Sequence, residues 1–403
     1  MNILYYIPEL SQAGGGARQY SCALLRILAQ DKENKYFILH NDKDPLIHDI
    51  LNENPHLTLI PRQFGRERSY ERLITNLIKG INLLLKVYGQ KRRLFVWGFE
   101  ERLRKRYQLD IIHCPYQHAA HTKAQVIATL HDVQELHFPE FFTPEERLER
   151  AKHYLGVTER ANVIVVSYQH VKEDLIRFFR RTSQNVYVCL LDMQQLWFEQ
   201  FINKPDLEAP PAYAQGEYIL YPAATWPHKN HLSLLAALAH LRDHYQVQIK
   251  LIATGHQTPH FEKVKQRLDE LQLHNQVIFT GIVPDVTLYN LYQRARAVVV
   301  PTRYEAGSFP LMESLLMGIP VICSNVTSLP ETIGDPQFVF DPDDVPDMAD
   351  KILRIMQDGH FRQQSLENAR KQGGRLKNTD ALWRLQQLYQ TLSSKAVTNS
   401  ELV

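Results

Sequence analysis

Short runs of β-branched and aromatic residues alternate with helical patterns along almost the whole chain. The first run, residues 3–7, is followed by apolar residues at positions i, i+3, i+4, i+7 and i+8 counted from Tyr20, which is the spacing of one helix face. Repeated alternation of this kind is typical of βαβ units on a parallel sheet, so we predict an α/β fold. The other strands predicted in the first half are 36–39, 57–60, 110–113, 126–130, 163–166 and 186–190.

A proline-rich segment separates two such series. A chain of 403 residues exceeds what one hydrophobic core usually organises, so two domains are expected. We predict a doubly wound first domain over residues 1–205, a linker over 206–216 and a doubly wound second domain over 217–377. A last amphipathic helix, 378–395, carries an apolar stripe that needs a partner. The strands predicted in the second series are 218–221, 249–253, 277–280, 297–301 and 321–324.

The basic residues are unevenly distributed. The whole chain has a formal net charge of only +2, and its aromatic residues match no RNA-binding signature, so we expect no nucleic-acid partner. Residues 66–106, however, hold twelve Lys or Arg and four Glu, a net charge of +8, which leaves −6 for the rest. Such a segment suits an acceptor or an anionic membrane surface, or else it is an ordinary helix with a solvated basic face. The residues of this candidate patch are Lys86, Lys91, Arg92, Arg93 and Trp97.

The four cysteines, Cys22, Cys114, Cys189 and Cys323, are far apart and form no Cys-x-x-Cys pair. This pattern favours buried free thiols in a reducing compartment over a disulfide framework.

No uninterrupted apolar stretch approaches the ~18–20 residues that a membrane span needs, and the first residues lack the basic region of a signal peptide. We therefore expect a cytoplasmic protein, and the basic segment raises the alternative of peripheral contact with the inner face of the membrane.

Three consecutive glycines, Gly14, Gly15 and Gly16, follow the first predicted strand. Ligands of open α/β sheets bind beyond the carboxyl ends of the strands, so motifs at these positions are candidates for binding. Glycines let the backbone approach a ligand, and a helix N-terminus favours a phosphate. The dinucleotide fingerprint G-x-G-x-x-G would need a glycine where this chain has Gln19, so a nicotinamide or flavin site is disfavoured. The alternative is a tight turn without a ligand.

His131 and Asp132 follow the predicted strand 126–130. A histidine at this edge could hydrogen-bond a substrate hydroxyl, while the aspartate orients it or caps the next turn. The alternative is a histidine with a purely structural role. The pair His118 and His121 has no acidic or cysteine ligands at supporting spacing, so we expect no metal site.

His228 and Lys229 are delivered by a proline-containing loop that follows the first strand of the second series. A lysine at this position can neutralise the charge of a diphosphate leaving group. The alternative is a solvated lysine at the start of a helix.

Two glutamates flank a candidate anion site in residues 301–313. A buried strand ends in a loop with small residues, and Pro310 then begins a helix whose N–H groups at Phe309, Leu311 and Met312 would point at an anion. Glu305 and Glu313 would repel that anion unless they bind hydroxyl groups, which suggests a sugar on one side and a ribose on the other. The alternative is a pair of solvated or capping glutamates.

The Glu305-x7-Glu313 pattern, with its neighbouring segments, resembles the signature of family 4 retaining glycosyltransferases, the "group 1" type with the GT-B fold. The similarity extends over nearly the whole chain. It implies two Rossmann-like doubly wound domains facing a central cleft, with the C-terminal helix crossing back to the first domain. The other segments that carry the resemblance are 14–16, 131–132, 227–230, 279–281, 296–297, 316–325, 328–331 and 340–344.

The resemblance also implies roles for single residues. Glu313 would hold the ribose hydroxyls of a nucleotide sugar, and Glu305 would bind the donor sugar. His131 would contact the donor sugar, and we expect His131, Lys229 and Glu305 to be the catalytic residues. The further residues expected to bind the donor are Gly15, Gly16, Gly281, Ile282, His228, Ser308, Phe309, Pro310, Leu311 and Met312.

The implied activity is transfer of a hexosyl group, such as mannose or glucose, from a UDP- or GDP-sugar to a glycan or lipid-linked acceptor in polysaccharide or cell-envelope biosynthesis. Such enzymes retain the anomeric configuration and need no metal, so no cofactor is expected. The chain departs from the family pattern at Ala224 and His228, where many members carry an arginine. The alternatives are a nucleotide-sugar epimerase or a phosphorylase-type enzyme on the same fold, and a non-catalytic glycan-binding protein.

Overall fold

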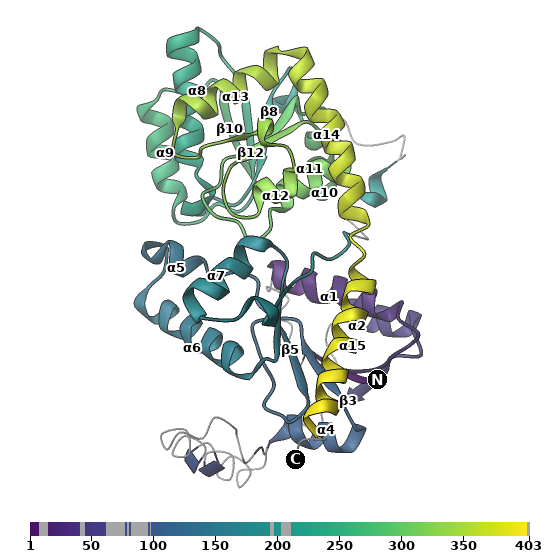
Figure 1. Cartoon of the computed structure of the whole chain (residues 1–403). Coiled ribbons are helices and arrows are strands. Elements are labelled where there is room, and N and C mark those ends of the chain that lie inside the picture. Colours follow the sequence, from purple (N-terminus) through teal and green to yellow (C-terminus); the bar gives the residue numbers. More distant parts are fainter. Residues whose placement is uncertain are drawn as a thin grey trace. The chain divides into compact units, whose positions relative to one another are not determined.

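The chain folds into two compact units, each built on a parallel sheet. The computed structural model describes residues 1–7, 15–40, 45–61, 77, 78, 80, 81, 96, 98–193, 197–202 and 211–400. Unit 1 comprises Met1–Asp192 together with Asp380–Val403, and unit 2 comprises Met193–Thr379. The prediction of two doubly wound, Rossmann-like α/β domains is confirmed (Figure 1).

Unit 1 holds a seven-stranded sheet in the order β3-β2-β1-β4-β5-β6-β7, in which all neighbouring strands are parallel. The side chains of β1 alternate between its two faces. Ile3, Tyr5 and Ile7 belong to one core cluster, and Leu4 and Tyr6 belong to the other. Both faces are therefore buried, as expected for a sheet covered by helices on each side. The strands are β1 (Asn2–Ile7), β2 (Lys35–His40), β3 (Thr58–Pro61), β4 (Ile111–Cys114), β5 (Gln125–Thr129), β6 (Val163–Val166) and β7 (Val186–Val188).

Two sets of helices cover this sheet. One core cluster includes residues of α1 (Gly15–Ala29), α2 (Pro45–Glu53) and α15 (Ala381–Ser400). The other includes residues of the helices on the opposite face, which are α4 (Phe99–Tyr107), α6 (Pro144–Arg160) and α7 (Gln169–Phe179), while the short α5 (Gln134–His137) follows β5.

The last helix, α15, packs on unit 1 although the preceding 187 residues belong to unit 2. It contacts α1 and β5, and Leu385, Tyr389 and Leu392 of its apolar stripe are buried in the core (Figure 1). The Tyr389 hydroxyl lies 2.9 Å from Nδ1 of His113, which is itself fully buried. The predicted return of this helix to the first domain is confirmed.

Unit 2 holds a six-stranded parallel sheet in the order β10-β9-β8-β11-β12-β13. Its strands are β8 (Ile219–Pro222), β9 (Leu251–Thr254), β10 (Val277–Gly281), β11 (Ala297–Val300), β12 (Val321–Ser324) and β13 (Val339–Phe340), the last of which is too short to be recognised from its pattern. Its helices are α8 (His231–Tyr245), α9 (Phe261–Glu270), α10 (Asp285–Arg294), α11 (Phe309–Met317), α12 (Leu329–Ile333), α13 (Val345–Gln357) and α14 (Gly359–Lys377).

The boundary between the units differs from the predicted domain end at residue 205. The chain enters unit 2 at Met193, whose N–H donates to the carbonyl of Leu376 at the end of α14, 2.9 Å away. Residues 197–202 follow in the same unit. The difference arises because the prediction used the prolines of the linker, whereas the change of unit depends on contacts between segments far apart in sequence.

None of the four cysteines, all of which lie in described parts of the chain, forms a disulfide, and all four are buried. Burial raises the pKa of the Cys114 thiol to about 12, so this group is a neutral core residue. Among the described residues, no helix is both long and apolar enough to cross a bilayer.

Candidate active site

The order of strands in unit 2 reverses between β8 and β11, and polar loops follow both strands. The chain runs outward from β8 through β9 and β10, and outward from β11 through β12 and β13. Ligands of open α/β sheets bind at the carboxyl ends of the strands beside such a reversal. The loop after β8 and the loop after β11 are therefore the two walls of a candidate active site.

The loop after β8 is anchored so that Lys229 has a fixed backbone position. The hydroxyl of Tyr221 donates to the Lys229 carbonyl at 2.8 Å. Asn230 adopts a left-handed conformation with φ 59°, which asparagine tolerates better than most residues. Its side-chain amide donates to the carbonyls of Pro301 and Pro342, both at 2.9 Å. One asparagine thus connects this loop to the loops after β11 and β13.

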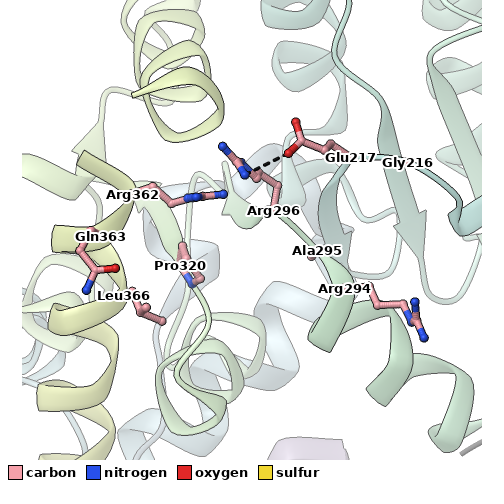
Figure 2. Close-up of a pocket in the computed structure, with 9 residues that line it drawn as sticks. All are labelled: Gly216, Glu217, Arg294, Ala295, Arg296, Pro320, Arg362, Gln363 and Leu366. Carbon is pink, nitrogen blue, oxygen red and sulfur yellow. Dashed lines mark ion pairs between the residues drawn. The ribbon is translucent and has the colours of Figure 1, made fainter. Parts of the chain in front are cut away.

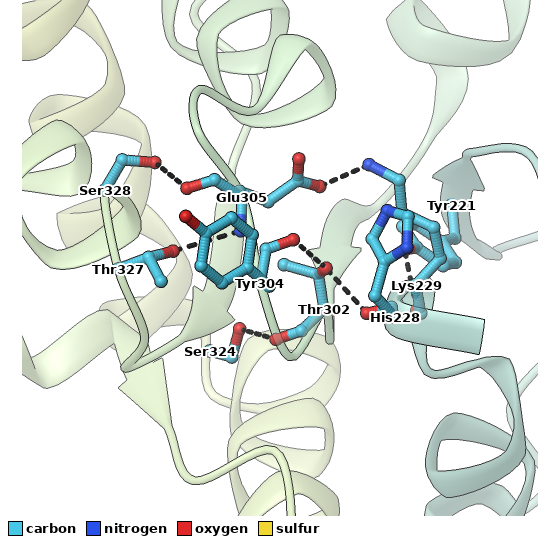
Figure 3. A network of polar contacts seen from close by, with 9 residues as sticks. All are labelled: Tyr221, His228, Lys229, Thr302, Tyr304, Glu305, Ser324, Thr327 and Ser328. Carbon is cyan, nitrogen blue, oxygen red and sulfur yellow. Dashed lines mark hydrogen bonds and ion pairs between the residues drawn. The ribbon is translucent and has the colours of Figure 1, made fainter. Parts of the chain in front are cut away.

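Lys229 and Glu305 form an ion pair between the two loops. Nζ of Lys229 lies 2.5 Å from Oε1 of Glu305, and the two side chains are only 17% and 9% exposed (Figure 3). Removing one partner from such a shielded pair leaves an uncompensated charge, which typically costs about 3–5 kcal/mol. An ammonium group has three donors, so Lys229 can contact Glu305 and a ligand oxygen together.

The loop after β11 is held by a series of hydroxyl groups. The backbone N–H of Glu305 donates to Oγ1 of Thr327 at 3.1 Å, and Oγ of Ser328 donates to the Glu305 carbonyl at 3.1 Å. The hydroxyl of Ser324, at the end of β12, donates to the Thr302 carbonyl at 2.5 Å (Figure 3). These bonds hold the backbone on both sides of Glu305, which keeps its carboxylate facing Lys229.

The first turn of α11 follows this loop. Ser308 is its N-cap residue, but its side chain makes no capping hydrogen bond, and Oγ is buried without a partner among the described residues. A buried hydroxyl without a partner is costly, so this group favours a ligand at the position. The N–H groups of Phe309 and Leu311 precede the first intrahelical bond, and Pro310 has none. The Met312 N–H donates to the Ser308 carbonyl at 2.9 Å, so it is not available to the anion for which it was predicted.

Glu313 has two hydrogen-bond partners that its sequence motif does not show. The indole Nε1 of Trp197 donates to Oε1 at 2.7 Å, and the Tyr292 hydroxyl donates to Oε2 at 2.7 Å. Burial raises the pKa of this carboxyl group, and the two donors oppose that effect. Each oxygen retains a lone pair for a ligand hydroxyl, and the carboxylate is held in one orientation.

Trp197 belongs to a small aromatic cluster. Its ring centroid lies 6.3 Å from that of Phe201 and 6.5 Å from that of Tyr292, and Phe201 lies 5.6 Å from Tyr289. The cluster attaches residues 197–202 to α10. In the sequence, the cluster shows only as a Trp-Phe pair at 197–198, after the last strand of unit 1, and such a pair does not predict a site residue.

Three further predicted donor-binding residues lie at the same edge of the sheet. Burial, with a smaller effect of Lys229, lowers the pKa of His228 to about 3, so its imidazole is neutral and supplies no second positive charge beside Lys229. Gly281 ends β10 with φ 71°, a conformation that favours glycine, and the side chain of Ile282 is 76% exposed. An exposed apolar residue at a strand end provides a surface on which a flat base can lie.

The predicted residues of unit 1 are found at strand ends as well. Gly15 and Gly16 are the first residues of α1, after β1. His131 follows β5, its ring lies edge-on to Tyr20 with centroids 4.8 Å apart, and its Nε2 has no partner among the described residues. Burial lowers the pKa of His131 to about 4, so the ring is neutral near pH 7.

Asp132 does not act on His131 as predicted. Oδ1 of Asp132 lies 2.8 Å from the Arg150 guanidinium, which also contacts Glu135 at 2.8 Å. The Asp132 carboxylate further accepts a hydrogen bond from the backbone of Gln134, which is the capping alternative. The sequence could not reveal Arg150 as the partner, because it lies eighteen residues away on α6.

The residues of the predicted basic patch, Lys86, Lys91, Arg92, Arg93 and Trp97, lie outside the described residues. The described end of the segment is α4, where Arg104 pairs with the buried Glu101 at 2.7 Å.

In the described part of the chain, no cluster of three His, Cys, Asp or Glu side chains could hold a metal ion.

Residues 204–372 match the family model described as glycosyl transferases group 1. The matched segment contains both loops of the candidate site and α11. The fold of the two units is that of GT-B glycosyltransferases, and the matched residues of unit 2 are similar to the group 1 glycosyl transferases.

Two curated relatives are bacterial mannosyltransferases. The chain is 28% identical over 263 residues to O-antigen chain mannosyltransferase B of Escherichia coli, covering 64% of this chain and 68% of that protein. It is 25% identical over 244 residues to O-antigen chain mannosyltransferase RfbU of Salmonella typhimurium, covering 60% of this chain and 64% of the relative.

Solved structures share the fold over almost the full length. A glycosyltransferase from Rickettsia africae superposes with a TM-score of 0.64 at 18% identity, covering 97% of this chain and 98% of that one. Anabaena Alr3699/HepE in complex with UDP gives a TM-score of 0.63 at 16% identity, covering 98% of this chain and 100% of the other. At these identities the similarity establishes the fold alone.

Proposed function

We propose that this protein transfers a hexosyl group, with mannose as the first candidate, from a UDP- or GDP-sugar to a growing glycan or lipid-linked acceptor, with retention of the anomeric configuration. Membership of family 4 is part of this proposal. The observation that carries it is the shielded Lys229–Glu305 pair beside α11, where the sheet reverses its order.

Each charge of this site suits one part of a nucleotide sugar. The Lys229 ammonium, the N–H groups of Phe309 and Leu311 and the buried Ser308 hydroxyl are donors for the diphosphate. Glu305 accepts hydrogen bonds from hydroxyls of the sugar, and Glu313 accepts them from the ribose diol. The carboxylates therefore select hydroxyl groups and the donors select phosphate.

The reaction breaks the bond between the anomeric carbon and the diphosphate oxygen and forms a bond from that carbon to an acceptor oxygen. Charge develops on the leaving diphosphate, and Lys229 stabilises it there. The departing diphosphate takes the proton of the acceptor hydroxyl, so no separate base is required. His131, neutral near pH 7, can hydrogen-bond a sugar hydroxyl but supplies no charge.

Mannose and an O-antigen type of acceptor are proposed because of the relatives. Both curated mannosyltransferases described above are named for the O-antigen chain. A third relative, the serotype-specific mannosyltransferase WbdA of Escherichia coli, is 26% identical over 227 residues, which cover only 27% of its length. The base of the donor stays open between uridine and guanosine.

A donor screen followed by product analysis tests the proposal. The purified chain is incubated with UDP- and GDP-hexoses and a mannose-containing oligosaccharide, and release of nucleoside diphosphate is measured with and without EDTA. We expect one donor to give turnover that survives EDTA, and NMR of the product to show the anomeric configuration of the donor. An inverted product would contradict the retaining mechanism. If no donor released nucleoside diphosphate in any combination with the acceptor, the proposed activity would be contradicted.

Binding is measured separately from turnover, because the acceptor is unknown. A ligand that binds the native state alone raises the unfolding temperature by mass action. We expect UDP or GDP, but not both equally, to stabilise the protein, and Glu313→Ala to remove that stabilisation. If the nucleotide raised the unfolding temperature of Glu313→Ala as much as that of the unaltered protein, the assignment of Glu313 to the ribose would be contradicted.

A further inference from the structure

A second basic pocket lies at the opposite edge of the unit 2 sheet. It encloses about 370 Å³ and is lined by residues that directly precede β8, β11 and β12, together with the first turns of α14 (Figure 2). Glu217 stands two residues before β8, and Arg296 and Pro320 come immediately before β11 and β12. The amino ends of the strands form this pocket, whereas the candidate active site uses their carboxyl ends.

The pocket has an excess of positive charge. Three arginines, Arg294, Arg296 and Arg362, line it, and Glu217 is the one acidic residue of the lining, so the net charge is +2. Glu217 forms an ion pair, because its Oε1 lies 2.9 Å from Nη1 of Arg296. The carboxylate of the nearby Asp358 caps α14 and accepts hydrogen bonds from two backbone N–H groups.

Two of the guanidinium groups converge. Figure 2 shows the side chains of Arg296 and Arg362 extending toward each other from opposite walls, whereas Arg294 extends away. Arg296 is fixed in place, because Nη2 donates to the Met356 carbonyl at 3.1 Å and Nη1 contacts Glu217. Its Nε is buried and has no partner among the described residues.

Like charges that face each other repel, and the repulsion is relieved when an anion lies between them. Within the described part of the chain, the Arg362 guanidinium forms no hydrogen bond or ion pair, so its donors are available to a ligand in the pocket. Guanidinium groups bind phosphate oxygens in a bidentate manner. We propose that this pocket is a binding site for a phosphate group, held between Arg296 and Arg362 and independent of the nucleotide-sugar site.

The phosphate can come from a small phosphomonoester or from an anionic lipid headgroup, since the chemistry of recognition is the same. Two arms of one experiment separate these sources. Isothermal titration calorimetry measures binding of inorganic phosphate and glycerol phosphate, and flotation measures binding to vesicles of phosphatidylglycerol against phosphatidylcholine. The unaltered chain, Arg362→Gln and Lys229→Met are compared in both arms.

We expect saturable phosphate binding that Arg362→Gln weakens by about tenfold or more, the factor for loss of one charge-assisted contact, and that Lys229→Met leaves unchanged. Arg267→Gln is the matched control, because Arg267 is a partly exposed arginine of the same unit that pairs with Glu270. Vesicle binding that depends on Arg362 assigns the phosphate to a lipid, and binding of the small ions alone assigns it to a soluble compound.

Two results would overturn the proposal. The first is absence of saturable binding in both arms. The second is binding that Arg362→Gln leaves intact, particularly if Lys229→Met abolishes it, because the phosphate would then occupy the nucleotide-sugar site. The native fold of Arg362→Gln is checked by its thermal unfolding, and the side chain has no structural partner that the substitution would remove.

Discussion

The polar groups at the carboxyl ends of the strands are held in different ways in the two units. In unit 2, Lys229 and Glu305 form a shielded ion pair, and hydroxyl groups fix the backbone around it. In unit 1, His131 is neutral and has no partner at Nε2 among the described residues, while Asp132 is occupied by Arg150.

This difference separates two kinds of recognition. A diphosphate carries charge, and a charged site must be fixed in advance if it is to stabilise charge without reorganisation. A neutral imidazole recognises hydroxyl groups by hydrogen bonding alone. Under the proposed function, unit 2 would bind the charged part of the donor, and the strand ends of unit 1 would bind neutral sugar hydroxyls.

The largest effect is expected from breaking the ion pair of unit 2. Lys229→Met should lower kcat/KM by about 10²–10³-fold, the usual loss when one stabilising donor for a developing oxyanion is removed. Steady-state kinetics with the donor found by screening measure it. Lys265→Met is the control, since Lys265 pairs with Glu262 at an exposed site of the same unit. A double variant with Glu305→Gln should regain stability but not turnover, and recovered turnover would contradict the role of the pair.

The core of unit 1 can be weakened without touching unit 2. Leu385 of α15 is 1% exposed, and Leu385→Ala should lower the free energy of unfolding of unit 1 by about 2–5 kcal/mol, because it removes buried apolar volume. Urea unfolding followed by circular dichroism measures this loss. The exposed Trp383→Ala serves as the control on the same helix. Nucleotide binding should survive in Leu385→Ala, and its loss would show that the two units are not independent.

Acid should affect unit 1 more than unit 2. Burial lowers the pKa of four histidines of unit 1, His113, His118, His131 and His170, to about 3–4. In unit 2 it lowers the pKa of His228 and His231 to about 3, and it also lowers that of His260. Their unfolded pKa is near 6.5, so between pH 6.5 and 4 the unfolded chain binds protons that the folded chain does not. Stability is therefore complete above pH 6.5 and falls as the pH is lowered through this window.

Each of these histidines contributes at most about 1.4 kcal/mol per pH unit to that fall. Hydrogen exchange of the two units at pH 7 and pH 5 measures it, and unit 1 should lose protection first. His131→Gln should reduce the pH dependence, because it removes one of these buried groups. Equal loss in both units would contradict the contrast between them.

The smallest effect concerns the orientation of Glu313. Trp197→Phe keeps an aromatic ring but removes the N–H that donates to Oε1, so nucleotide affinity should fall by about two- to tenfold, the value of one hydrogen bond. Tyr292→Phe is the matched variant for Oε2. Calorimetric titration with the nucleotide measures both. Unchanged affinity in both variants would show that Glu313 needs no help from these donors.

Much of the fold follows from local patterns. Twelve of the thirteen strands in the described part of the chain lie where runs of β-branched residues predicted them, because a strand buried on both faces needs such a run. Lys229, Glu305 and Glu313 could be predicted as site residues because each follows a strand or begins a helix at a characteristic spacing. Pairings between distant residues left no such pattern. Trp197 and Arg150 were therefore missed as partners of Glu313 and Asp132.

The sequence by itself determined the two α/β domains, the apolar stripe of the last helix and the polar residues that follow the strands. These features depend on periodicity and spacing, which are local properties of a chain. Only the tertiary structure decided the state of those residues. It placed Lys229 2.5 Å from Glu305 and set Trp197 against Glu313. It also brought Arg296 and Arg362 to one pocket from positions 66 residues apart. Charge and burial depend on neighbours in space, and folding alone brings those neighbours together.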